Sequence, residues 1–172
     1  KGRWLVAQPS LGSEEAEGGM VVSNAQGPPT AKDPGAWLRN PQFLLYVKQR
    51  TSAFIFLSQR DTRMRSEAEE AWGKKGMEAW KPNAYHTAIA FLVAKASVIK
   101  EKGARMRKSD FVAVSGFNQD RDVSTPFTLQ LQPQDSPYVV IPMTLEPNQQ
   151  GPFVLTVWHK GDKRTLLVRG GE

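Results

Sequence analysis

The amino-acid sequence predicts an all-β fold, an antiparallel sandwich of eight strands. Short apolar runs recur along the chain, turn residues separate them, and amphipathic helical patterns are almost absent. Twelve prolines and fourteen glycines interrupt the 172 residues, which suits many short strands better than long helices. Hydrophobic residues form 40% of the chain, enough for the core of one domain of ordinary size.

The predicted strands follow one another with short spacings. Residues 43–47 and 54–57 are separated only by residues 48–53, a spacing that predicts a hairpin. In residues 123–131, Phe127, Leu129 and Leu131 are expected to share one face. Pro142 is expected to end the strand before it. The eight strands are predicted at residues 3–6, 43–47, 54–57, 87–93, 123–131, 138–141, 153–158 and 165–168, with a shorter ninth candidate at residues 111–114.

A single domain is expected over residues 1–172, with two irregular parts. Residues 12–35 are rich in Gly, Pro, Ser and Glu and predict a long surface loop. The one helix candidate, residues 66–72, has Ser66 as its N-cap and lies in an insertion over residues 65–82. The first residues resemble a strand and lack the apolar region of a signal peptide, so we expect this chain to be cut from a longer protein.

The composition excludes several classes of site. Because the chain has no cysteine, it can hold no disulfide, thiolate metal site or cysteine nucleophile, which fits a reducing compartment such as the cytoplasm. His86 and His159 stand at predicted strand ends and are interpreted as structural, although either could meet a serine and an aspartate in space. The G-x-S-x-G, P-loop and G-x-G-x-x-G patterns are absent. We therefore expect no catalytic residue in this chain.

Acidic residues offer one weak calcium candidate. Its carboxylates would come from Glu67, Glu69, Glu70 and Asp61. Oxygen ligands suit calcium, but the spacing is not that of an EF-hand and two lysines follow at once. A solvated helix face explains the same residues. No cofactor is expected, and calcium is disfavoured without being excluded.

The most specific feature is a group of basic residues within residues 95–108. Six cations are opposed there only by Glu101, so the segment carries +5 of the formal net charge of +6. Such a loop at one end of a sandwich could attract anionic lipid or an acidic protein face; a solvated loop is the alternative explanation. Nucleic acid is not expected, because no aromatic residues are interleaved with the cations. The candidate lipid- or partner-binding residues are Lys95, Lys100, Lys102, Arg105, Arg107 and Lys108.

Several motifs, in order along nearly the whole chain, resemble the pattern of one known family. Residues 138–155, YVVIPMTLEPNQQGPFVL, resemble its pattern Y-V-I-V-P-S-T-F-E-P-N-x-x-G-x-F-x-L. Residues 37–45, WLRNPQFLL, and residues 86–91, HTAIAF, resemble its W-x-N-P-Q-Y/F and H-T-I-G-F strands. Residues 2–4, GRW, resemble its Gly-x-Trp opening. This is the pattern of domain III of calpain proteases, a C2-like β-sandwich.

The resemblance implies a non-catalytic, regulatory and scaffolding domain of a calpain-type, calcium-dependent cysteine protease. Such a domain packs on the protease core and meets anionic membranes or partner proteins. The family's acidic, calcium-responsive loop corresponds to residues 48–52, which are short and basic here, so calcium binding is not carried over. A protein-interaction module of a protease-dead calpain relative is the alternative, and an independent hydrolase is a remote third. The EPNQQG turn at residues 146–151 is predicted to close a hairpin.

Overall fold

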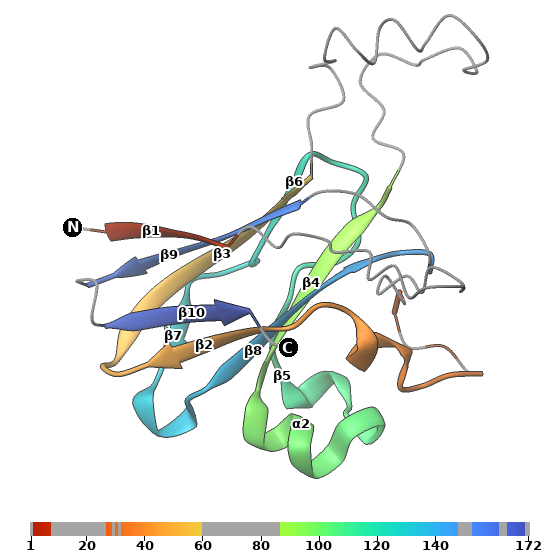
Figure 1. Cartoon of the computed structure of the whole chain (residues 1–172), viewed down its shortest axis with the longest axis horizontal. Coiled ribbons are helices and arrows are strands. Elements are labelled where there is room, and N and C mark those ends of the chain that lie inside the picture. The colour runs from red at the N-terminus through yellow and green to blue at the C-terminus, as the bar shows by residue number, and fades with distance from the viewer. Residues whose placement is uncertain are drawn as a thin grey trace, which may run out of the picture.

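The computed structural model is an antiparallel sandwich of two five-stranded sheets (Figure 1), which confirms the predicted fold class. The structure describes residues 2–7, 27–28, 30, 32–59, 87–147, 153–161 and 165–170, the first of these and residue 170 by their backbone alone. Sheet A contains β1 (Gly2–Ala7), β9 (Phe153–Lys160), β3 (Thr51–Gln59), β6 (Asp122–Ser124) and β7 (Leu129–Leu131). Sheet B contains β10 (Leu166–Gly170), β2 (Phe43–Val47), β8 (Tyr138–Thr144), β4 (Ile89–Lys95) and β5 (Phe111–Val114). The described residues thus form ten strands where eight were predicted, and the ninth candidate is confirmed as β5.

The main core lies between the two sheets. On β2 and β3, buried residues alternate with partly exposed ones, as expected for strands that face the core on one side only. Ile55 and Val157 of sheet A and Leu45 and Phe91 of sheet B are wholly buried members of this core. Their burial is the main hydrophobic contribution that joins the sheets.

A second core lies on the outer face of sheet B. Strands β4 and β8 are buried along almost their whole length, because their outward-facing residues are covered as well. The cover consists of the 3-10 helix η1 (Ala36–Arg39) and of the connection between β4 and β5, which contains α2 (Ala96–Lys102) (Figure 1). The buried members of this outer core are Trp37, Ala90, Leu92, Val139, Ile141 and Met143, with Leu38, Leu44, Ala96, Ile99, Met106 and Phe111 packed against them.

Both predicted hairpins are wrong, because each pair of strands is divided between the two sheets. β2 pairs with β10 and β8, whereas β3 pairs with β6, β7 and β9. In the same way β8 belongs to sheet B and β9 to sheet A. Both connections therefore carry the chain from one layer of the sandwich to the other. A short gap between two apolar runs does not distinguish such a crossing from a hairpin.

The strand predicted over residues 123–131 is interrupted. Ser124 pairs with Phe56 and Leu129 pairs with Ala53, so two residues of β3 face four residues, 125–128, on the other chain segment. Thr125 turns inward: its N–H donates to the Ile55 carbonyl at 3.0 Å, and its Oγ1 accepts from the Ile55 N–H at 3.4 Å. The residues that follow bulge outward, and Phe127 is 53% exposed. The expectation that Phe127 faces the core with Leu129 is therefore wrong.

Pro142 does not end its strand, since β8 continues to Thr144. The Leu145 N–H donates to the Ala88 carbonyl at 2.9 Å, and alternate residues of an antiparallel strand point to the same neighbour. The nitrogen of Pro142 therefore points away from β4, toward the side of β2. Because β2 pairs with β8 only as far as Val140, no donor is needed at that position.

Several predicted features lie outside the described residues. They are the helix candidate at residues 66–72, the insertion at residues 65–82, His86 and most of the loop at residues 12–35. The carboxylates considered for calcium, Glu67, Glu69, Glu70 and Asp61, lie outside them as well. The described part of the loop is held to the fold where Asn40 Nδ2 donates to the Gly27 carbonyl at 2.8 Å.

Candidate functional site

Lys95 is the last residue of β4, and the other five candidate basic residues lie on the connection between β4 and β5. Residues 95–110, called the basic segment from here on, form α2 and then the short 3-10 helices η2 (Gly103–Arg105) and η3 (Lys108–Asp110). The predicted inter-strand loop is thus a short helix followed by two turns. Ala96 and Ile99 lie three residues apart on one helix face and pack on the outer core, which explains why this stretch is helical.

The basic segment is anchored to sheet B at several points. Beyond the helix, Met106 and Phe111 also pack on the outer core. The Phe111 ring meets the buried Trp37 ring edge to face, with centroids 5.7 Å apart and planes at 79°. Such aromatic pairs add about 0.5–1.5 kcal/mol beyond the area they bury. The charged side chains between these anchors are therefore presented from a fixed backbone.

Trp37 is placed by the WLRNPQ motif, residues 37–42. Asn40, itself buried, donates through Nδ2 to the Trp37 carbonyl at 3.1 Å, and Gln42 Nε2 donates to the Leu38 carbonyl at 2.7 Å. Arg39, within the motif, pairs with Asp33, and this contact is the main reason why the pKa of the Asp33 carboxyl lies below its ordinary value. The motif that carries the family resemblance therefore holds the outer core and, through it, the basic segment.

Two of the six cations are neutralised by ion pairs. Lys95 Nζ lies 2.8 Å from Asp135 Oδ1, and Lys102 pairs with Asp110. Asp110 also accepts a hydrogen bond from the Arg107 N–H at 2.7 Å, so its carboxylate ties α2 to η3. That backbone hydrogen bond, followed by the Lys102 contact, lowers the pKa of Asp110. Neither partner was predicted, because Asp110 and Asp135 both lie outside residues 95–108.

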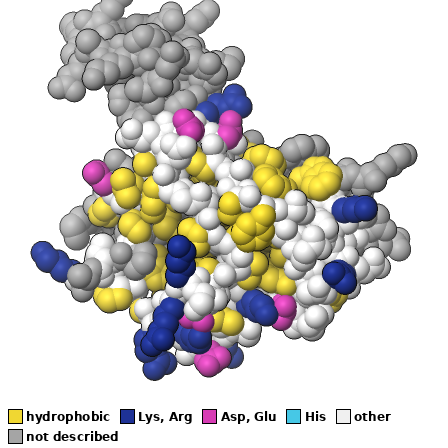
Figure 2. All heavy atoms as spheres, turned by 180° about the vertical axis from the view of Figure 1, so that it is seen from behind, with side chains coloured by type: hydrophobic (Ala, Val, Ile, Leu, Met, Phe, Trp, Pro, Cys, Tyr) yellow, Lys and Arg dark blue, Asp and Glu magenta, His cyan; other side chains and the backbone are white. Residues whose placement is uncertain are grey.

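The other four cations are exposed. Within the described residues, no ion pair involves Lys100, Arg105, Arg107 or Lys108, and Arg105 donates only to the Glu101 carbonyl at 3.4 Å. Four cations less the exposed Glu101 leave a local charge of +3. Lys and Arg side chains gather near the lower end of the face shown in Figure 2, below a broader area of hydrophobic side chains.

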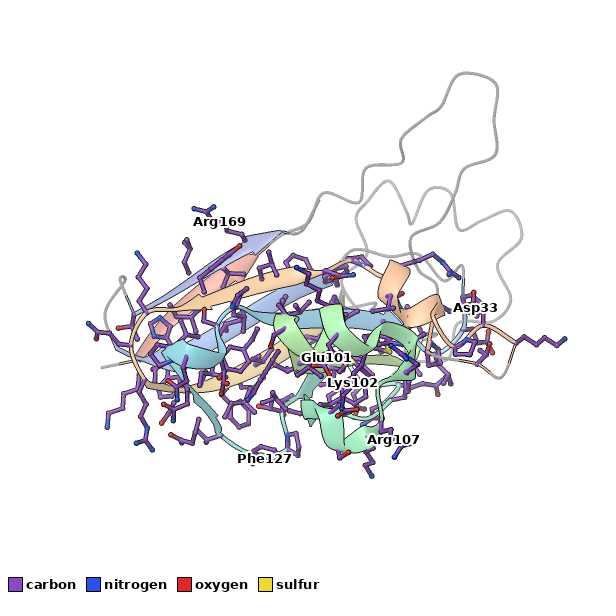
Figure 3. All side chains as sticks on the ribbon, turned by 90° about the horizontal axis from the view of Figure 1, so that it is seen from below. Asp33, Glu101, Lys102, Arg107, Phe127 and Arg169 are labelled. Carbon is purple, nitrogen blue, oxygen red and sulfur yellow. The ribbon has the colours of Figure 1, made fainter. Side chains whose placement is uncertain are left out.

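Three large apolar side chains are exposed in the chain from β5 to β7. They are Val114 at the end of edge strand β5, Phe117 on the connection to β6 and Phe127 in the bulge, with exposed fractions of 42%, 37% and 53%. Phe127 and Arg107 both lie along the lower margin of Figure 3, whereas Arg169, on β10, lies on the opposite margin. Apolar and cationic groups therefore occur together on one side of the molecule.

Acid should weaken the fold through Asp110. The pKa of Asp110 is lower in the folded protein than in the unfolded chain, so the unfolded chain binds this proton at a higher pH. The stabilisation from Asp110 is therefore complete above the ordinary pKa of 3.8, and it is lost as the pH falls below that value. We expect urea unfolding at several pH values to show a smaller acid loss for Asp110→Asn than for the native chain. Glu101→Gln, a neighbouring exposed carboxylate, is the control. Equal acid losses in the native chain and Asp110→Asn would contradict the assignment.

The described residues show no catalytic or metal arrangement. His159 is wholly buried on β9, opposite Ala53, as expected for a structural histidine. No group of three or more His, Asp or Glu that could hold a metal ion occurs in the part of the chain that the structure describes. No helix among these residues has the length and apolar character needed to cross a membrane.

Comparison with known families decides which fold family this sandwich represents. Residues 16–158 match the family described as calpain large subunit, domain III. The chain belongs to the calpain domain III family. Domain III is a non-catalytic, C2-like β-sandwich of calpains, which are cysteine proteases, and so the predicted family is confirmed. A comparison with curated proteins found no match. In this domain III, the basic segment follows β4 and packs on the outer face of sheet B.

Proposed function

We propose that this domain III binds anionic phospholipid surfaces through the basic segment and so regulates the location of a calpain-type cysteine protease. The observation that supports this proposal is the exposure of Lys100, Arg105, Arg107 and Lys108 on a segment anchored to the fold. Each basic residue near an anionic membrane contributes roughly 1 kcal/mol. A fixed group of four can therefore bind measurably without a deep pocket.

The surroundings of the basic segment favour a membrane over nucleic acid. Phe127 is 53% exposed and lies along the same margin as Arg107 (Figure 3), so its ring could enter the interfacial region of a bilayer. Within residues 95–110 there is no aromatic side chain, and the ring of the following Phe111 is engaged by Trp37. Base stacking would need a free ring beside the cations.

Removal of the four exposed cations should abolish most vesicle binding. We expect substitution of Lys100, Arg105, Arg107 and Lys108 by Ser to lower the partition coefficient on phosphatidylserine-containing vesicles by about 1000-fold, since four charges contribute about 4 kcal/mol of electrostatic attraction. Co-sedimentation at low salt measures the partition coefficient, and binding should fade as salt rises.

A matched variant removes the same charge elsewhere. Its four substitutions to Ser fall on the exposed residues Lys48, Arg50, Lys160 and Arg169. This variant has the same net charge as the first, so a difference between them reports the position of the charge. Equal weakening in both variants, or binding to pure phosphatidylcholine vesicles, would overturn the proposal. An acidic protein face would then be the better partner for the basic segment.

We also infer that the domain packs on a protease core in a longer cytoplasmic protein. Membership of the calpain family supports this inference. The coding sequence upstream of Lys1 tests it. A region with catalytic Cys, His and Asn residues would support an active protease, whereas a region that lacks them would favour the alternative of a protein-interaction module.

A further inference from the structure

One serine directly follows the exposed cations in the chain. Ser109 is exposed in η3, directly after Lys108, two residues after Arg107 and four after Arg105. The neighbouring carboxylate of Asp110 is already engaged by Lys102 and by the Arg107 N–H. Arg105, Arg107 and Lys108 form no ion pair among the described residues, although the charge of Arg107 also acts on the Asp110 carboxylate.

We propose that Ser109 is a phosphorylation site for a serine kinase that selects basic residues before its target, and that phosphoserine there releases the domain from anionic membranes. The release step rests on the lipid binding proposed above. In the reaction, Ser109 Oγ attacks the γ-phosphorus of a nucleoside triphosphate bound to the kinase. An O–P bond forms, the bond between the β- and γ-phosphates breaks, and the nucleoside diphosphate leaves. The hydroxyl proton passes to a base of the kinase.

The local structure allows a kinase to reach this serine. The turn η3 has no buried residue and is closed by the Asp110 N–H to Arg107 carbonyl bond at 2.9 Å and by the Asp110 side-chain contacts. Met106 and Phe111 remain packed on the outer core on either side. Opening η3 to an extended form therefore exposes a short basic strip without removing an apolar anchor.

Phosphorylation of Ser109 would remove most of the positive charge of the basic segment. A phosphoserine carries about −1.5 to −2 at neutral pH, which would reduce the local charge from +3 to about +1. The phosphate would also pair with Arg105 or Arg107 and withdraw them from lipid headgroups. Loss of two effective charges should weaken binding to anionic vesicles about 30-fold.

Ser97 offers a matched comparison within the same segment. It is also exposed, but it lies inside α2, and its nearest preceding cation, Lys95, is paired with Asp135. A kinase that needs an extended substrate with free cations before the target should therefore prefer Ser109 to Ser97.

The experiment treats the whole chain with the catalytic fragment of protein kinase C and MgATP, and maps phosphate by mass spectrometry. We expect phosphate on Ser109 in the native chain and in Ser97→Ala, and none at this position in Ser109→Ala. After phosphorylation, the native chain should bind phosphatidylserine vesicles about 30-fold more weakly and elute from heparin at lower salt. Ser109→Ala treated in the same way should keep its binding.

The outcomes separate the two proposals. Absence of phosphate on Ser109, or full vesicle binding by the phosphorylated chain, overturns the present inference. If the untreated chain fails to bind vesicles, the proposed lipid binding is wrong. Phosphate incorporation and the heparin shift then still decide whether Ser109 is a modification site that controls the charge of the basic segment.

Discussion

Replacing Trp37 with alanine is expected to lower the free energy of unfolding by about 3–5 kcal/mol, the range for a large buried aromatic side chain. Trp37 is only 2% exposed, and its ring is the central contact between η1, sheet B and Phe111. Urea unfolding followed by circular dichroism measures the loss.

The Trp37 substitution should also act locally. Because Met106 and Phe111 pack on the same core, hydrogen exchange in α2 should rise more than exchange in sheet A. A double-mutant cycle with Phe111→Ala should give a coupling energy of about 0.5–1.5 kcal/mol. Trp158→Ala, the same change at a half-buried position, is the control and should cost less. Equal losses at the two tryptophans would show that the outer core contributes little.

Replacing Phe91 with alanine is also expected to lower the free energy of unfolding by about 3–5 kcal/mol, but by weakening the main core. Phe91 lies on β4, wholly buried among residues of both sheets, so its removal weakens the contact between the layers. Exchange should then rise in both sheets together. Phe127→Ala makes the identical chemical change at a residue that is 53% exposed and should alter stability by less than about 0.5 kcal/mol. A large loss for Phe127 and a small one for Phe91 would reverse the assignment of the core.

Short apolar runs predicted several strands well. Residues 43–47 coincide with β2, and the short candidate at residues 111–114 coincides with β5. Such runs are bounded by turn residues and have the length of a strand, which is why they were found from the sequence. Pairing partners were not predictable in this way. Whether a short connection stays in one sheet or crosses to the other depends on packing between layers, which residues 48–53 do not encode.

The outer core had a signal in the sequence that was not used. Residues 89–94 and 138–143 are apolar at six consecutive positions, whereas the apolar run within β3 covers only residues 53–57. A continuous apolar run is typical of a strand buried on both faces, so β4 and β8 had to be covered by something outside the sandwich. The nearest candidate was the segment after β4, where Ala96 and Ile99 have helical spacing.

The basic residues were found from sequence, but their pairing was not. Charge counting over residues 95–108 overestimated the free charge, since Asp110 and Asp135 neutralise Lys102 and Lys95. Asp110 lies just beyond the counted range, and Asp135 reaches Lys95 because the end of β4 lies beside the start of β8. Such partners depend on strand register, which local composition cannot supply.

The pairing of β1 with β9 has a consequence for synthesis on the ribosome. β9 is the central strand of sheet A between β1 and β3, so neither has its main neighbour until residues 153–160 have emerged. β2 likewise waits for β10 on one side. Because nearly all pairings of sheet A join distant parts of the chain, contact order is high and folding should take place late, in about milliseconds to seconds. The growing chain must therefore carry exposed apolar strands for most of its synthesis, which makes it a candidate for chaperone binding.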